Sequence, residues 1–431
     1  MQVAQTRISL LTRWQSSKIW VGPGIWAIAD QGQFAASNFA FNVLLAKWLV
    51  PSEFGLFALT YSALLLVGTV HTSLIVEPML IFGSGRYGHQ LRQYFAAILR
   101  GHAAFSLVVA VALGFIALSL RFAGAHQFAA ASMSGALAAP FVFLLWVGRR
   151  ACYVVREPRL AAAGGFFYMV ATLVGGYALG YHGMLTAPTA LAWLATVSLG
   201  SSAWLFFSLR RRIQQTNERV RLQVFLLDHW VYGRWALFAN AMAWFPGSIS
   251  LFFLSWRASL ASAGVLKALM NLVLPVMHVN TALATLLVPS LVRLKVDEQF
   301  GATLRATTLV VAGTCAGYWV MLAVFHKQIV RFVYGDLYLP HSGLLLLLGA
   351  LPLMSAISMI YGAAIRSLER PDRLALAQAV GATTAIVLGY LAVIRWDLLG
   401  AIVGTLSGYT VAATASWRSY KALRNSISSG A

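Results

Sequence analysis

Residues 29–59, "ADQGQFAASNFAFNVLLAKWLVPSEFGLFAL", place a short connector around Pro51 between two hydrophobic segments. The segment before the connector carries several polar side chains, whereas the segment after it is almost entirely apolar. This arrangement predicts two consecutive helices, over 26–48 and 54–78. The composition of the whole chain decides what surrounds them.

Hydrophobic residues make up 59% of the 431 residues and charged residues only 10%. A soluble domain carries about 25% charged residues, so this chain cannot cover itself with a solvated surface. The composition therefore predicts a polytopic membrane protein whose main partner is the lipid bilayer. The formal net charge of +20 does not indicate nucleic-acid binding, because the basic residues are scattered in short loops between apolar runs.

A helix needs about 20 apolar residues to cross the hydrocarbon core of a membrane. On that basis the sequence predicts twelve transmembrane helices, and the loops between them are too short to contain a soluble domain. The longest connection, 210–231, is basic and is expected to lie along the membrane surface. The predicted spans are 26–48, 54–78, 95–120, 124–147, 160–181, 187–209, 232–254, 263–290, 304–326, 342–365, 374–394 and 399–417.

Lysine and arginine are distributed unevenly between the two sides that these spans define. All but seven of the 32 basic residues lie at the termini or in even-numbered loops. The positive-inside rule then predicts that both termini are cytoplasmic. The seven on the opposite side are Lys47, Arg121, Arg257, Lys267, Lys327, Arg331 and Arg395.

The two halves of the chain resemble each other weakly. "LVPSEFGLFALTYSALLLV" (49–67) aligns with "ASLASAGVLKALMNLVLPV" (258–276), which matches Gly55 to Gly264. Both stretches begin the second span of their half. Chance similarity between apolar segments is the alternative explanation of such a match.

A second match in the same order supports a duplication. "REPRLAAAGG" (156–165) aligns with "RPDRLALAQA" (370–379) at nearly the same offset. Two copies of a six-span unit would be related by a pseudo-twofold axis along the membrane normal, and transporters built this way bind substrate between halves that rock against each other. The predicted domains are an N-terminal six-helix lobe (1–209), a cytoplasmic basic linker (210–231) and a C-terminal six-helix lobe (232–431).

Span 8 contains a polar stripe within "KALMNLVLPVMHVNTALAT" (267–285). At 100° per residue, Lys267, Asn271, His278 and Thr285 fall within about 40° of one another. A lysine that faces lipid near a helix centre costs about 3 kcal/mol, so such residues usually face a bundle interior or an aqueous cavity. The stripe therefore predicts a wall of the substrate cavity, although Lys267 alone could extend to the nearby outer surface.

The repeat maps this stripe onto a part-polar face of span 2 that includes Ser62 and Thr69. Two equivalent helices with polar faces predict a cavity lined from both lobes. Span 7 adds Asn240 and Trp244, whose indole could stack on a sugar ring or simply pack in the bundle.

Span 1 is more polar still, and its polar residues cover about half of the helix. We expect Asn38 and Asn42 to line the cavity. Asp30 and Glu77 are the two acids within reach of the bilayer, and His71 lies on span 2 near Glu77. A buried carboxylate can exchange H⁺ or Na⁺, so these three residues are candidates for ion coupling, with a structural hydrogen-bonded cluster as the alternative.

The sequence contains no Walker-type phosphate loop, no cluster of metal ligands and no large extracytoplasmic loop with paired acids. We therefore expect no enzyme activity, no catalytic residues, no bound metal and no resident cofactor. A coupling ion is the one small species that the residues leave open.

The first two spans resemble the first helical hairpin of polysaccharide exporters. These exporters belong to the multidrug/oligosaccharidyl-lipid/polysaccharide flippase superfamily, which includes the O-antigen flippases. The resemblance extends over essentially the whole chain through the predicted six-plus-six architecture. It is carried by the polar first span, by the later match at Gly264, and by the connector residues Trp48, Leu49, Pro51, Glu53, Phe54 and Gly55.

The resemblance implies an all-α membrane protein with a MATE-like, V-shaped pair of six-helix lobes in the bacterial cytoplasmic (inner) membrane. It implies a flippase for an isoprenoid-pyrophosphate-linked oligosaccharide used in lipopolysaccharide O-antigen or exopolysaccharide export, with a polysaccharide polymerase or export machinery as partner. Members often line the cavity with cations, and Lys267, Arg257 and Arg234 are compatible with that role. The rival interpretations are a cation-coupled multidrug exporter of the same superfamily and a transport-inactive scaffold.

Overall fold

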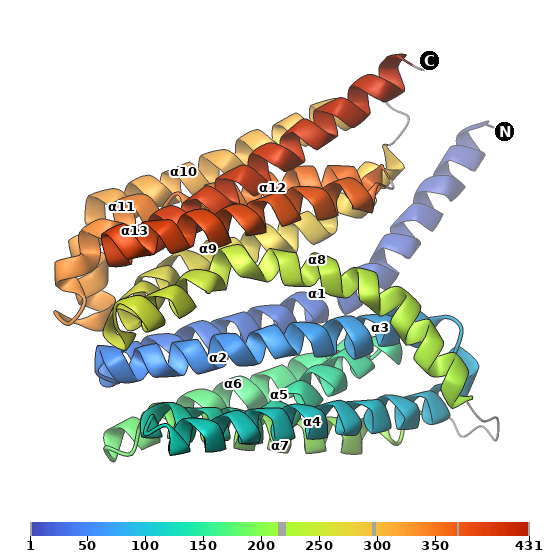
Figure 1. Cartoon of the computed structure of the whole chain (residues 1–431). Coiled ribbons are helices and arrows are strands. Elements are labelled where there is room, and N and C mark those ends of the chain that lie inside the picture. Colours follow the sequence, from blue (N-terminus) through green and yellow to red (C-terminus); the bar gives the residue numbers. More distant parts are fainter. Residues whose placement is uncertain (1, 214–220, 295–298, 369, 430–431) are drawn as a thin grey trace.

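The computed structural model describes residues 2–213, 221–294, 299–368 and 370–429, and within them the chain is helical with short loops and no strand. Figure 1 shows the N-terminal half as one group of helices and the C-terminal half as another. The first group comprises α1 (Gln2–Trp48), α2 (Pro51–His71), the π-helical segment η1 (Thr72–Val76), α3 (Glu77–Ser84), η2 (Gly88–Gln90), α4 (Leu91–Phe122), α5 (His126–Val154), α6 (Pro158–Tyr181) and α7 (Ala187–Leu209). The second comprises α8 (Leu222–Arg257), α9 (Leu260–Arg293), α10 (Gln299–Tyr334), η3 (Leu339–Leu344), α11 (Leu345–Leu348), α12 (Leu351–Ser367) and α13 (Pro371–Ser429).

The described part of the chain contains ten helical stretches long and apolar enough to cross a membrane. The last of them, in α13, is a hairpin, because its backbone leaves helical geometry at Asp397 with φ of 44°. A Cβ atom at Gly404 would lie 2.3 Å from the Cα atom of Gly389, so the two arms run antiparallel in contact. With this hairpin counted as two passages and α1 as a further one, the prediction of twelve transmembrane helices is confirmed.

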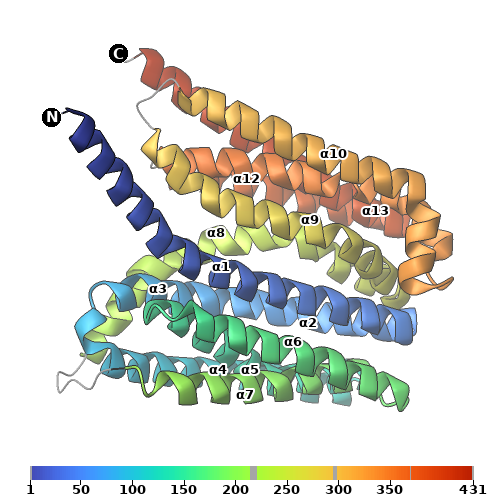
Figure 2. The same cartoon turned by 180° about the vertical axis from the view of Figure 1, so that it is seen from behind.

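The two lobes meet at one end and diverge toward the end where both chain termini lie (Figures 1 and 2). At the closed end α2 crosses α9 with backbones in contact. A Cβ atom at Gly55 would lie 1.8 Å from the carbonyl oxygen of Leu260, and one at Gly264 would lie 2.0 Å from that of Pro51. Only glycine tolerates this approach.

Gly55 and Gly264 are also the residues that the sequence repeat pairs. A Cβ atom added to either glycine would lie 3.0 Å from the backbone nitrogen of the other. Equivalent residues that contact each other in this symmetric way must lie close to a twofold axis. The contact therefore marks the pseudo-twofold axis between the lobes.

Among the ten apolar stretches of the described residues, those of α4 and α10, the third helix of each lobe, are the least buried. Their outward faces carry large apolar side chains such as Phe115 and Leu309, which are 71% and 74% exposed. Exposing such apolar faces to water would cost free energy, but lipid tails are as apolar as these side chains. The exposed pattern is that of a bundle whose solvent is the bilayer.

Span 2 is interrupted by η1, which lies just before Pro78. Proline has no backbone N–H, so the carbonyl of Leu74, four residues earlier, has no helical donor there. His229 of α8 supplies one, since its Nδ1 lies 2.8 Å from that carbonyl oxygen. The irregular segment thus joins α2 to the other lobe.

The start of α8 differs from the predicted linker 210–231. The helix begins at Leu222, so residues 222–231 are helical and pack on the N-terminal lobe (Figure 1). The basic sequence did not predict this helix, because basic residues at the membrane edge occur both in surface loops and at the ends of long helices. Residues 214–220 lie outside the described residues.

Candidate functional site

Asp30, the first acid expected in the membrane, is fully buried and paired with Arg149 of α5. One carboxylate oxygen accepts a hydrogen bond from the guanidinium Nε at 2.9 Å, and the other accepts one from the Tyr153 hydroxyl at 2.7 Å. The guanidinium also lies 4.0 Å from the centre of the Phe34 ring. Asp30 is therefore a neutralised carboxylate with both of its oxygens engaged.

His71 of α2 and His102 of α4 form a second buried pair. Nε2 of His71 lies 3.0 Å from Nδ1 of His102. A hydrogen bond between two imidazoles needs one donor and one acceptor, so at least one ring must be neutral while the bond exists. The pair links α2 and α4 inside the N-terminal lobe.

Glu77 contacts the other lobe. The side-chain amide of Asn240 in α8 donates to its carboxylate at 2.9 Å and to the hydroxyl of Ser73 at 3.1 Å. The three candidates for ion coupling thus have three different partners rather than one shared site. Within the described residues, no group of three His, Cys, Asp or Glu side chains is arranged to hold a metal ion.

The first turns of α8 form a polar contact with the N-terminal lobe. It consists of Asp228 and His229 of α8 together with Arg86, Tyr87 and Tyr94. The Asp228 carboxylate accepts hydrogen bonds from Arg86 at 2.5 Å and Tyr87 at 2.8 Å, and Nε2 of His229 lies 2.9 Å from the Tyr94 hydroxyl. Burial and the Asp228 carboxylate raise the pKa of Tyr87 to about 12, so its hydroxyl stays protonated at neutral pH.

Lys267 of α9 is partly buried and has no hydrogen bond or ion pair with another residue in the part of the chain that the structure describes. It follows Gly264 by three residues, so it lies about one helical turn from the contact between the lobes and on a neighbouring face. This places an unpaired cation beside the interlobe contact.

The other residues of the predicted stripe differ in their exposure. Asn271 is fully buried and its amide has no hydrogen-bond partner among the described residues, whereas His278 is exposed. The side chain of Thr285 lies outside the described part of the structure. The stripe is therefore not one continuous exposed wall in this conformation.

Several of the other residues predicted to line the cavity are instead buried or hydrogen-bonded within a lobe. Ser62, which the repeat pairs with Asn271, is also buried. The Thr69 hydroxyl donates a hydrogen bond to the carbonyl of Leu65 in its own helix. Asn42 bonds to the carbonyl of Asn38 at 2.8 Å. On α8, Trp244 packs against aromatic rings on its own helix, and its indole N–H is buried with no partner among the residues described.

The predicted span boundaries place Arg150 in a loop, but it lies in α5, which continues to Val154. The structure shows no ion pair between Arg150 and a carboxylate among its described residues. The Arg150 guanidinium lies 5.7 Å from the centre of the Tyr153 ring. It is a second interior cation without a dedicated carboxylate.

Sequence reasoning also missed Arg149, His102, Asp228 and His229. A usable signal was present only for Arg149, because "GRRACYV" keeps its apolar character after the two arginines and so allows the helix to continue. The others become recognisable only through partners distant in sequence.

No family model matches the chain, and no curated protein matches it. Solved structures do. An inward-facing multidrug resistance MATE family transporter of the MOP superfamily has a TM-score of 0.75 at 13% identity, covering 94% of this chain and 99% of that one. The lipid II flippase MurJ in an inward closed conformation has a TM-score of 0.75 at 13% identity, covering 92% and 87%.

An outward-facing MATE family transporter gives a lower TM-score of 0.65 at 13% identity, covering 93% of this chain and 95% of that one. At these identities the likeness describes the fold. The chain has the two-lobe, twelve-helix fold of the MATE and lipid II flippase structures of the MOP superfamily.

Proposed function

We propose that the chain is a flippase that moves an isoprenoid-pyrophosphate-linked oligosaccharide across the cytoplasmic membrane of a bacterium for surface polysaccharide assembly. The two lobes would provide alternating access, with both termini on the cytoplasmic side. A polysaccharide polymerase or export complex would receive the product. The likeness in fold to a lipid II flippase supports a lipid-linked substrate.

The observation that carries this proposal is the balance of charge inside the bundle. Asp30 is neutralised by Arg149, whereas Lys267 and Arg150 have no carboxylate paired with them among the described residues. An unpaired lysine within a membrane costs about 3 kcal/mol, and an anionic group between the lobes would offset that cost. A pyrophosphate is such a group.

The same balance weighs against the drug-exporting alternative. An exporter of organic cations needs an available carboxylate in its cavity, and the Asp30 carboxylate is fully occupied by Arg149 and Tyr153. Glu77 has no ion pair with a cation among the described residues and accepts a hydrogen bond from the opposite lobe. If transport is coupled to H⁺ or Na⁺, we propose Glu77 as the coupling carboxylate.

The test is flipping of a fluorescent pyrophosphate-linked oligosaccharide lipid in proteoliposomes. We expect Lys267→Ala to slow flipping about tenfold or more, because a hydrogen bond to a charged group contributes about 1.5–3 kcal/mol. The matched control is Lys327→Ala, which removes an exposed lysine from α10 and should leave the rate unchanged.

Equal rates for wild type and Lys267→Ala would exclude Lys267 as a phosphate contact. Export of a cationic dye without flipping of the lipid would overturn the glycan proposal in favour of a drug exporter. A wild-type protein that moves neither compound would indicate the scaffold.

A further inference from the structure

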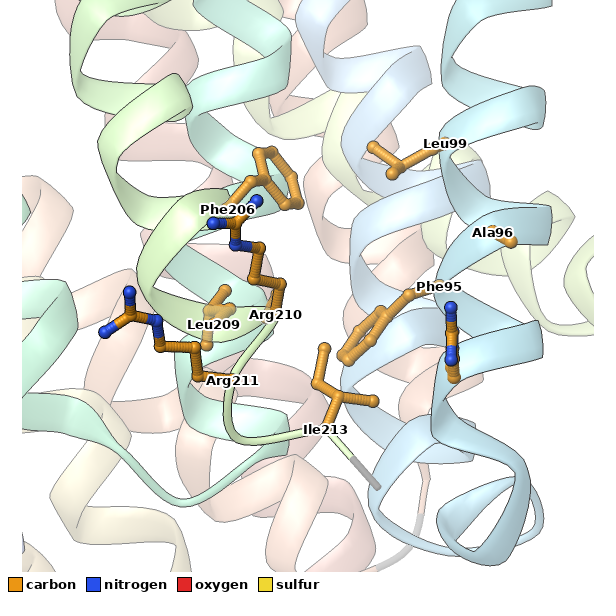
Figure 3. Close-up of a pocket in the computed structure, with 10 residues that line it drawn as sticks. Phe95, Ala96, Leu99, Phe206, Leu209, Arg210, Arg211 and Ile213 are labelled. Carbon is orange, nitrogen blue, oxygen red and sulfur yellow. The ribbon is translucent and has the colours of Figure 1, made fainter. Parts of the chain in front are cut away.

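A separate cavity lies in the N-terminal lobe between the terminus-side ends of α4 and α7. Its volume is about 610 Å³, and Ala151 of α5 contributes to its lining. Figure 3 shows Phe95, Ala96 and Leu99 of α4 on one side, facing Phe206 and Leu209 of α7 on the other. This part of the lining is thus apolar.

The rim of the same cavity is basic. Arg92, in the first turn of α4, belongs to the lining. Arg210 and Arg211, which follow the last turn of α7, are labelled in Figure 3. All three side chains are exposed, and the structure pairs none of them with a carboxylate within its described residues. The neighbouring Arg212, by contrast, forms an ion pair with Glu157. The rim therefore combines three uncompensated charges.

The helices that line the cavity lie on the side of the N-terminal lobe away from the C-terminal lobe. In Figures 1 and 2, α4 and α7 lie on the face of the N-terminal lobe that is farthest from α9 to α13. The surrounding helix faces carry exposed apolar residues, including Leu107 and Val108 of α4. The cavity therefore lies outside the space between the lobes and beside helix faces whose apolar side chains are exposed.

We propose that this cavity binds an anionic phospholipid of the leaflet next to the chain termini. The phosphate contacts Arg92, Arg210 and Arg211, and the upper acyl chains lie on Phe95, Leu99 and Phe206. Basic pockets between membrane helices bind anionic headgroups, and each arginine or lysine contributes to the attraction. The site is independent of the transported substrate, because it lies outside the interlobe space.

The test is native mass spectrometry of the purified protein after exchange into detergent containing equal amounts of phosphatidylglycerol and phosphatidylcholine. Wild type should retain phosphatidylglycerol preferentially. The variant Arg92→Gln/Arg210→Gln/Arg211→Gln should lose that preference at least about tenfold, given the contribution of each charge. Ala96→Trp, which fills the cavity and keeps every charge, should lose it as well.

The charge-matched control is Arg305→Gln/Arg418→Gln/Lys421→Gln, which removes three exposed basic residues from the C-terminal lobe. It should retain phosphatidylglycerol like wild type. Equal loss in this control, or no loss in the first triple variant or in Ala96→Trp, would overturn the proposal. Displacement of the lipid by glycerol phosphate at equal concentration would also overturn it, because the cavity would then be a phosphate site and not a lipid site.

Discussion

At the scale of single residues, the interior of the N-terminal lobe depends on paired polar groups. Asp30 and Arg149 are both almost completely shielded, with side-chain exposures of 0% and 7%. Gly165 keeps the neighbouring helix close, since a Cβ atom there would lie 3.2 Å from the Asp30 carboxylate. A pair packed this tightly stabilises the bundle as long as both partners are present.

We predict that Asp30→Asn destabilises the protein by about 3–5 kcal/mol, because it leaves the Arg149 charge buried without a counter-ion. The measurement is the free energy of unfolding in detergent. The control Asp336→Asn breaks an exposed pair with Arg331 and should cost about 1 kcal/mol or less. A similar decrease in the free energy of unfolding for the two variants would show that the buried pair contributes no more to stability than the exposed one.

At the scale of helices, the contact between α2 and α9 depends on the absence of two side chains. A Cβ atom at Gly264 would lie 2.0 Å from the carbonyl oxygen of Pro51, so the helices must separate to accept even alanine. The interruption at η1 also joins the lobes, at the other end of the same span, because it leaves the Leu74 carbonyl free to accept a hydrogen bond from His229. One helix therefore holds both lobes by two different devices.

Gly264→Ala should open the closed end of the molecule. Overpacking of this kind costs about 1–3 kcal/mol, which shifts a two-state population about 5- to 150-fold. Spin labels at the exposed residues Val50 and Trp256 would report a shift toward longer distances. Gly114→Ala is the control, since no atom lies within 4 Å of a Cβ atom added there, and an identical shift in that variant would contradict the prediction.

At the scale of the whole molecule, both termini lie at the end where the lobes diverge (Figure 1). An even number of passages requires this, and the excess of basic residues on that side predicts that it faces the cytoplasm. The two native cysteines, Cys152 and Cys315, are free and buried, so they do not interfere with labelling of introduced cysteines.

In intact cells, a membrane-impermeant maleimide should label Ala123→Cys but not Ser84→Cys. Both positions are exposed, but Ala123 follows α4 at the end away from the termini and Ser84 ends α3 on the terminus side. After permeabilisation both should react. The opposite pattern in intact cells would place the termini outside the cell and would overturn the predicted orientation.

The sequence by itself determined the membrane class, the number of passages and the weak repeat that pairs Gly55 with Gly264. These properties follow from hydropathy, which is summed along the chain, and from a repeat that needs no knowledge of contacts. It also located polar residues in spans 1, 2, 7 and 8, although it could not show which of their charges are paired with an opposite charge.

Only the tertiary structure decided which charges are neutralised and which are available. Asp30 and its partner Arg149 are 119 residues apart, and Glu77 and Asn240 are 163 apart. Whether a carboxylate in a membrane acts as an ion site or as a structural pair depends on the cation that packing brings beside it, and local pattern does not contain that information. The physical reason is that hydropathy belongs to each residue separately, whereas electrostatic compensation belongs to pairs that exist only after the helices have packed.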